Sequence, residues 1–252
     1  MKEYRFIFIE ELKKIYRNKF IYVYACIFAL NIIGICSEFY DRINSVYYSE
    51  VGVHIQGQAL EYLTKYEFGY SGQLVFYLLP ILFIAAPIFA DEYASGMYKN
   101  IRVSKNGRIL TTLAKINVVI VCQVLWCVWI AALTSIMSYV LLDIGITAIA
   151  SDVKILVAYL LNTLFGMFFV AIVFMLISSL SKNTIVALGI GFAVLLAQIL
   201  VEVKGIYGHF IPVIGMAANS LMERNWIETV MVWSFYIIGG LFTGGLIIRV
   251  NK

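Results

Sequence analysis

The stretch INVVIVCQVLWCVWIAALTSIMSYVLL runs from Ile116 to Leu142 and contains no charged residue. A bilayer core about 30 Å thick needs about 20 helical residues at about 1.5 Å each, with roughly 17 as the minimum. The stretch is therefore long enough to cross a membrane as one helix. It predicts an integral membrane protein.

Five further stretches of the same kind divide the chain. They cover residues 20–36, 73–90, 155–180, 185–201 and 229–248, and the shortest of them lie at the minimum length for a span. Hydrophobic residues make up 62% of the 252 and charged residues 13%, which leaves too little polar surface for a soluble domain of this size. No repeat or linker interrupts the pattern. The sequence predicts one all-α domain, residues 1–252, with six transmembrane helices.

Lysine and arginine collect on one side of these spans. Fourteen of the 19 fall on the side of the N-terminus and five on the other side. Because cytoplasmic loops are enriched in Lys and Arg, we expect a multi-pass plasma membrane protein with both termini in the cytoplasm. The net charge of +4 then reflects topology, and no nucleic-acid partner is expected.

The segment before the first span is amphipathic. Apolar and aromatic side chains recur at helical spacing on one arc, and charged ones occupy the opposite arc: Tyr4, Phe8, Leu12, Ile15 and Tyr16 against Glu3, Glu10, Lys13, Lys14 and Arg17. This pattern predicts a cytoplasmic helix lying at the membrane interface. The alternative is a cytoplasmic extension of the first span.

The two longest exterior segments differ in character. Residues 37–72 are acidic and rich in tyrosine, whereas residues 202–228 hold two short apolar pieces, one of them around Pro212. Neither piece is long enough to span. Such pieces are typical of broken or re-entrant segments, so we expect one before the sixth span.

Polar groups inside the spans bear on transport. The uncharged ones are sparse and form the candidate substrate path: Asn31, Gln123, Asn162 and Gln198. Interhelical hydrogen bonding is the alternative role for these four. No charged residue lies deep in a span, which argues against a proton-coupled carrier or an ion pore with acidic rings.

Sites for catalysis, nucleotide or metal are not indicated. The four cysteines lie in or at the edge of apolar spans without metal-ligand spacing, so no metal is expected. The chain has no GxxxxGK[ST] loop and so does not hydrolyse nucleotide by that route. We expect no catalytic residue in this chain.

The informative segment follows the second span. It begins with two carboxylates and continues with a glycine, a serine and several cations: Asp91, Glu92, Gly96, Lys99, Arg102, Ser104, Arg108 and, at the mouth of the third span, Lys115. We expect Glu92 and Arg108 to be exposed loop charges. A compact charged helix joined to two transmembrane helices can transmit motion from a cytoplasmic partner. An ordinary positive-inside loop is the alternative.

The order of these residues resembles the membrane subunit of type-2 ATP-binding-cassette (ABC) exporters. That family has a carboxylate after the second span, then Glu-x3-Gly, a Ser followed by Arg, and a Lys opening the third span. Met97 and Val103 depart from its common Thr and Pro. The resemblance implies a permease without its own ATPase site and without a bound cofactor. Its partners would be the lipid bilayer, a separate ABC ATPase subunit that binds ATP and Mg²⁺, and a second permease subunit, identical or related.

Within that family the chain is similar to the short permeases of bacitracin and lantibiotic immunity transporters. This likeness implies export or removal of an antimicrobial peptide or another amphipathic compound, with the loop after the second span docking into the ATPase. Two other classes stay open at this point. One is an intramembrane enzyme, and the other is a membrane anchor or sensor that transports nothing.

Overall fold

The structure is a computed structural model that describes residues 2–43, 71–96, 107–142, 153–200, 210–212 and 226–251. Its helices in chain order are α1 (Lys2–Tyr16), α2 (Lys19–Ile43), α5 (Ser71–Ala85), α6 (Pro87–Ala94), α8 (Gly107–Leu142), α10 (Val153–Ser181), α11 (Thr184–Leu200) and α14 (Trp226–Val250). The described part of the chain contains no strand. The all-α prediction is confirmed for these residues.

Four of these helices are long and apolar enough to cross a membrane, judged by length and composition. They contain the stretches Lys19–Glu38, Arg108–Met137, Leu160–Ser181 and Trp226–Val250. One of the other two predicted spans is shared between α5, with 15 residues, and α6, with 8, and the other falls on α11, with 17. The count of six spans therefore stays a prediction.

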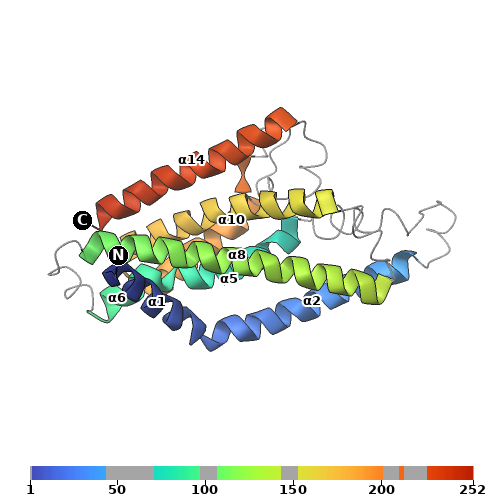
Figure 1. Ribbon diagram of the computed structural model, residues 1–252, viewed down its shortest axis with the longest axis horizontal. Coiled ribbons are helices and arrows are strands. Elements are labelled where there is room, and N and C mark those ends of the chain that lie inside the picture. Colours follow the sequence, from blue (N-terminus) through green and yellow to red (C-terminus); the bar gives the residue numbers. More distant parts are fainter. Residues whose placement is uncertain are drawn as a thin grey trace.

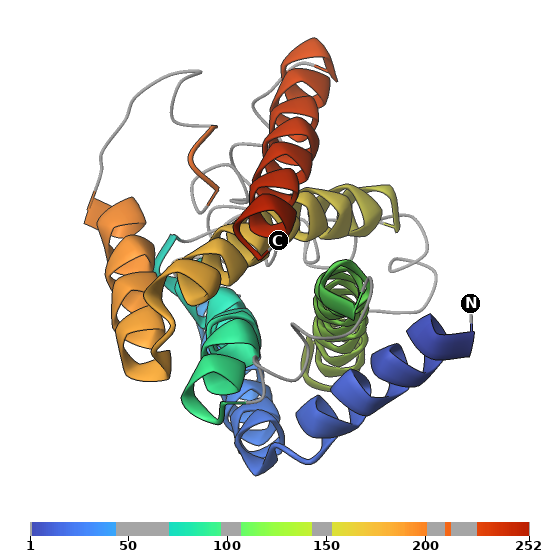
Figure 2. The same ribbon diagram turned by 90° about the vertical axis from the view of Figure 1, so that its left-hand side faces the viewer.

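The spanning helices lie side by side, roughly along the long axis of the molecule (Figure 1). The N-terminus, the C-terminus, α6 and the beginning of α8 all lie at one end. Seen from that end, α1 is viewed from its side while α8 is viewed nearly along its axis (Figure 2). The first helix thus crosses the end of the bundle and does not extend the first span. Its place at a membrane interface stays a prediction.

Asparagine side chains fix two of the turns between helices. The Asn18 carboxamide oxygen accepts the Phe20 N–H at 3.1 Å and so caps the start of α2. The Asn183 oxygen accepts the N–H groups of Ile185 and Val186 at 2.9 and 3.3 Å, which caps α11 in the same way. Each cap lets the chain reverse or bend at the end of the bundle that holds α6.

The core lies around α10, whose most apolar segment is half buried. Phe174 and Met175 are fully buried there. Glycines of two neighbouring helices allow close approach: a Cβ at Gly240 of α14 would meet the ring of Phe168, and one at Gly191 of α11 would meet Leu82. Both glycines therefore pack against side chains of this same chain.

Large apolar side chains cover the outside of the helices. Leu30 on α2, Ile185 on α11 and Phe242 on α14 are each more than two-thirds exposed. In a water-soluble protein such contiguous apolar surface would promote association. Around membrane-spanning helices it is the surface that faces lipid.

Several helix boundaries differ from the prediction. Helix α2 continues to Ile43, so the first residues of the predicted exterior loop are helical, and α8 begins at Gly107, before the predicted start at Ile116. The predicted span 73–90 is divided between α5 and α6 because Pro87 cannot donate a backbone hydrogen bond. Residues 44–70 and most of the predicted re-entrant segment 202–228 lie outside the described residues.

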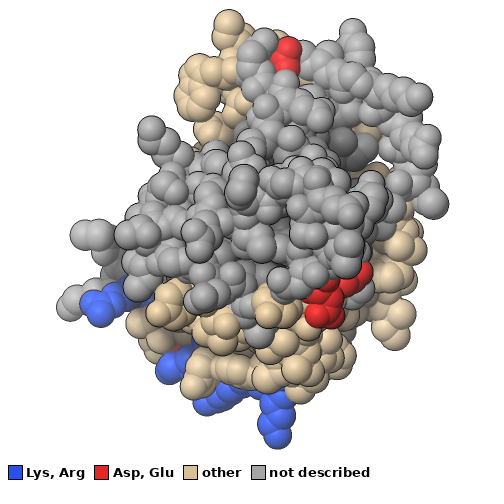
Figure 3. Space-filling model, turned by 90° about the vertical axis from the view of Figure 1, so that its right-hand side faces the viewer, with Lys and Arg blue, Asp and Glu red and all other residues tan. Residues whose placement is uncertain are grey.

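Charged side chains also separate along the long axis. Described carboxylates at the far end belong to the end of α2 and the beginning of α14: Glu38, Asp41 and Glu228. Figure 3 faces that end and shows carboxylates in red on it, with Lys and Arg in blue along its edges. The described basic residues Lys13, Lys14, Arg17 and Lys19 lie instead on α1 and at its junction with α2, by α6.

Candidate functional site

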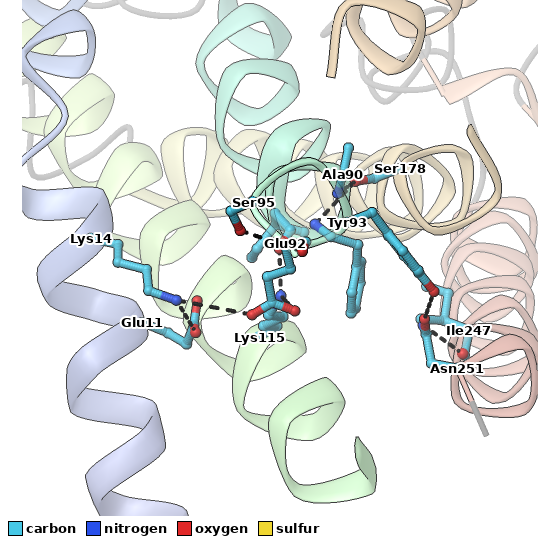
Figure 4. Close-up of polar contacts among 12 residues, drawn as sticks. Glu11, Lys14, Ala90, Glu92, Tyr93, Ser95, Lys115, Ser178, Ile247 and Asn251 are labelled. Carbon is cyan, nitrogen blue, oxygen red and sulfur yellow. Dashed lines mark hydrogen bonds and ion pairs between the residues drawn. The ribbon is translucent and has the colours of Figure 1, made fainter. Parts of the chain in front are cut away.

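Helix α6 begins with Pro87 and occupies the end of the bundle shared by both termini. The backbone N–H groups of Phe89 and Ala90 donate to the Ser178 hydroxyl oxygen of α10, both at 3.1 Å. This serine satisfies two donors at a proline-induced break in the helical hydrogen bonds. Helix α6 is thereby fixed to the centre of the bundle (Figure 4).

Gly96 ends the α6 segment. Its φ of 73° lies in the left-handed region that glycine adopts without a steric penalty. The Ser95 N–H bonds to the Asp91 carbonyl at 2.9 Å, and the Gly96 N–H bonds to the Tyr93 carbonyl at 3.3 Å. The predicted site glycine is therefore the helix terminator.

Glu92 forms a buried ion pair with Lys115 of α8. The Glu92 Oε2 to Lys115 Nζ distance is 2.6 Å, and the Lys115 side chain has no exposed surface. The same ammonium group donates to the Ile88 carbonyl oxygen and lies 4.5 Å from the centre of the Phe89 ring. All three of these contacts of the buried cation come from α6.

Helix α1 contributes a second cation to the pair. Lys14 Nζ lies 2.6 Å from Glu11 Oε1 and 4.0 Å from Glu92 Oε1 (Figure 4). The Glu92 Oε1 atom is buried and has no hydrogen-bond partner among the described residues. The four charges thus alternate from α1 through α6 to α8, since Glu11, Lys14, Glu92 and Lys115 follow one another in space.

Two further side chains of α6 reach the remaining helices. The Thr184 hydroxyl at the start of α11 donates to the Asp91 carboxylate. The Tyr93 hydroxyl donates to Asn251 Oδ1 at 3.2 Å, just beyond α14, and Lys182 lies 5.3 Å from the Tyr93 ring centre. Helix α6 is therefore bonded to α1, α8, α10, α11 and the end of α14.

A cavity of about 280 Å³ lies between α1 and the α5–α6 junction. Its walls include the carboxylates of Glu11, Asp91 and Glu92 and the ammonium group of Lys14. On α1, hydrogen bonding from Lys13 holds the pKa of the exposed Glu10 carboxyl below its usual value. Lysines of α1 thus lie beside three carboxylates: Lys13 beside Glu10, and Lys14 beside Glu11 and Glu92.

The structure brings part of the predicted site together. Glu92 and Lys115 pair between α6 and α8, the neighbouring Asp91 bonds to Thr184 of α11, and Arg108 lies partly exposed in the first turn of α8. The expectation that Glu92 is an exposed loop charge is wrong, because it is buried against Lys115. Lys115 lies inside α8, two turns from its start. The predicted site residues Lys99, Arg102 and Ser104 lie outside the described residues.

Sequence reasoning missed Glu11, Ser178, Thr184 and Asn251. Ser178, Thr184 and Asn251 are short polar side chains near helix ends and carry no periodic signal, and Glu11 is one of several charged residues of an amphipathic helix. Pro87 was the one feature of the sequence that indicated a polar contact to α6 from another helix. A proline within an apolar span leaves backbone groups that another helix has to satisfy.

The candidate substrate-path residues lie mostly between helices. Gln123 Nε2 donates to the Met167 carbonyl oxygen at 2.6 Å, and Asn162 accepts the Trp233 indole N–H at 3.1 Å. Gln198 donates to Val194 of its own helix, and Asn31 is half-buried on α2. The contacts of Gln123 and Asn162 are of the kind that holds membrane helices together. A role in substrate passage stays a prediction for all four.

Comparison with protein families identifies the chain. The family described as ABC-2 family transporter protein matches residues 7–198. The chain belongs to the ABC-2 transporter family. The match includes α6, the segment after it and Lys115. No curated protein matches the chain, and no solved structure does.

Membership of the ABC-2 transporter family fixes the broad class of the protein. It is a multi-pass membrane protein and the membrane component of an ABC-2 type transporter. ABC-2 membrane components lack an ATPase domain and work with an ABC ATPase. Among the described residues no group of three or more His, Cys, Asp or Glu side chains is placed to hold a metal ion.

Proposed function

We propose that this ABC-2 component is a six-span permease with cytoplasmic termini that exports its substrate with ATP hydrolysed by a separate subunit. The backbone at Ala86 is helical, with φ −66° and ψ −42°, and its N–H bonds to the Leu82 carbonyl at 2.9 Å. The predicted span 73–90 is therefore one helical path of about 27 Å, close to the minimum length of a span. Helix α11 has the minimum length of a span.

The observation that carries the proposal is the fixation of α6 by contacts to five other parts of the bundle. The charged segment 97–106 connects α6 to α8, and the Glu92–Lys115 pair joins these two helices. A force applied to that segment by a docked ATPase would move α6 and α8 together, and the bonds of Ser178, Thr184 and Asn251 would pass the movement to α10, α11 and α14. Rigid-body rocking of this kind is a known basis of gating.

The substrate we propose is a membrane-active antimicrobial peptide, as in bacitracin or lantibiotic immunity. Support comes from the acidic, tyrosine-rich segment 37–72 and from the resemblance of the chain to short immunity permeases. Negative potential and aromatic rings attract cationic amphipathic peptides. Two such permeases, identical or related, would form the transport path.

Charge reversal at Arg108 tests the coupling. Arg108 lies at the start of α8, directly after segment 97–106, and is partly exposed. If it pairs with the ATPase, Arg108→Glu removes one partner of an interfacial ion pair, which costs roughly 2 to 5 kcal/mol or about thirtyfold or more in affinity. Copurified ATPase and transport should both fall, with membrane abundance unchanged.

The matched control is Glu61→Lys in the proposed exterior segment, which should leave ATPase association intact. Full association and transport in Arg108→Glu would show that Arg108 is not part of the coupling contact. Substrate identity is tested separately by deleting the gene and measuring inhibitory concentrations of bacitracin and several lantibiotics. Unchanged values for all of them would reject peptide export and leave the permease proposal standing.

A further inference from the structure

A cavity of about 430 Å³ lies between α1, α2, α5 and α8, on the side of the bundle away from α14. Its volume is within the range of sites that hold small molecules, roughly 300–1,000 Å³. Pro80 and the buried Ile81 of α5 form part of its wall, and Trp126 of α8 lies at its side. The lining is almost entirely apolar.

Amphipathic aromatic side chains surround the cavity where it meets the surface. Tyr16 is 75% exposed and Trp129 is 41% exposed, and both line it. The Tyr22 hydroxyl donates to the Tyr16 carbonyl oxygen at 2.9 Å, which fixes the end of α1 to α2 beside the cavity. Tyrosine prefers the headgroup level of a bilayer, whereas Trp129 is the central residue of the predicted span Ile116–Leu142. The cavity therefore extends from headgroup depth at Tyr16 and Tyr22 to the middle of the span at Trp129, as an acyl chain does.

The charge beside the cavity is positive. Lys13 is the charged residue of the lining, and Arg17 and Lys19 stand in the chain between the lining residues Tyr16 and Ile21. Glu10 pairs with Lys13 at 2.8 Å and offsets one of these charges. The remaining excess suits a phosphate group and disfavours a cationic ligand.

We infer that this cavity binds the acyl chain of an anionic phospholipid of the cytoplasmic leaflet, with its phosphate held by Arg17, Lys19 and Lys13. The lipid would join the α1–α2 turn to α5 and α8, next to the charged residues of α6. The inference rests on the cytoplasmic position of α1 in the proposed topology, and it requires no ATPase.

Tryptophan quenching by brominated lipid tests the site. A variant with Trp129, Trp226 and Trp233 changed to Phe keeps Trp126, which is buried within the protein and lines the cavity. The protein is reconstituted in phosphatidylcholine vesicles with a minor fraction of phosphatidylglycerol, and either that fraction or an equal fraction of phosphatidylcholine carries bromine. Each net cation near a headgroup favours an anionic lipid by about fivefold. Lys13, Arg17 and Lys19 less Glu10 leave two net cations, so brominated phosphatidylglycerol should quench at about 25-fold lower fractions.

Two further variants decide between lipid in the cavity and lipid around the protein. Ala25→Phe fills the cavity and should abolish the quenching, whereas Ile27→Phe, on the exposed side of the same helix, should not. Arg17→Gln with Lys19→Gln should remove the preference for phosphatidylglycerol and keep the quenching.

Equal quenching by both lipids in the starting variant would overturn the inference in favour of unspecific surrounding lipid. Quenching that persists in Ala25→Phe would also overturn it. Relief of the quenching by an added peptide substrate would assign the cavity to the transport path instead. Since no ATPase is present, failure of the coupling proposal does not affect these readouts.

Discussion

The Lys115 side chain carries an ammonium group without exposed surface, and its nearest carboxylate is that of Glu92 on α6. Glu92 lies 2.6 Å away, and the Ile88 carbonyl and the Phe89 ring complete the surroundings of the cation. Removing one partner of a buried pair leaves the other charge uncompensated, at a cost of about 3 to 5 kcal/mol. The pair therefore contributes strongly to the contact between α6 and α8.

We predict that Glu92→Lys destabilises the purified protein by about 3 to 5 kcal/mol, because it buries two cations beside each other. The double variant Glu92→Lys with Lys115→Glu should recover part of this loss, since the pair is restored in reverse. Denaturant unfolding in detergent measures both. Glu10→Lys is the control, because the Glu10–Lys13 pair is exposed and worth at most about 1 kcal/mol. A Glu92→Lys protein as stable as the control would contradict the prediction.

Residues of this kind show where sequence reasoning succeeds and fails. Asp91, Glu92 and Lys115 were placed in one site from their order along the chain. The burial of Glu92 and Lys115 was not predicted, because charged residues near the end of a span are also what topology alone requires. Only the packing of α1 and α8 around α6 distinguishes a buried lysine from an exposed one.

At the scale of elements, apolar length predicted most helices well. The stretches that include Ile116–Leu142 and 155–180 are helical throughout, in α8 and α10. The break in the second span was not predicted, since Pro87 is compatible with a kinked helix as well as with a new one. The break is stabilised by Ser178, which is far away in the sequence, on α10. Its hydroxyl oxygen accepts the two N–H groups near the break.

The Ser178 contact gives an element-scale prediction. Ser178→Ala removes the acceptor of two buried N–H groups, which costs about 1 to 3 kcal/mol. We expect the amides of Phe89 and Ala90 to exchange hydrogen faster in this variant. Ser179→Ala is the matched control, because the Ser179 hydroxyl bonds to the Leu176 carbonyl of its own helix. Equal exchange in the two variants would show that Ser178 does not hold α6.

At the scale of the whole molecule, both described chain ends lie at the end that holds α6 (Figure 1). Two chain ends on the same side of a membrane require an even number of crossings, and the six predicted spans meet this requirement. The described Lys and Arg residues of α1 and of its junction with α2 lie near that end, whereas Glu38, Asp41 and Glu228 lie near the other end. The excess of positive charge favours a cytoplasmic position for the end with α6.

Labelling in intact cells tests this orientation and the count of six spans together. The background is a variant in which Cys26, Cys36, Cys122 and Cys127 are changed to Ala. Single cysteines at Tyr48 and Asn225, in the segments before the second and sixth predicted spans, should react with an impermeant maleimide. A cysteine at Asn100, in the proposed coupling segment, should react only after the membrane is opened, because fourteen of the 19 cations place that side in the cytoplasm. Labelling at Asn100 in intact cells would show the opposite orientation, in which no cytoplasmic ATPase can reach this segment. Protection at Tyr48 alone would show that the first and second predicted spans do not both cross the membrane.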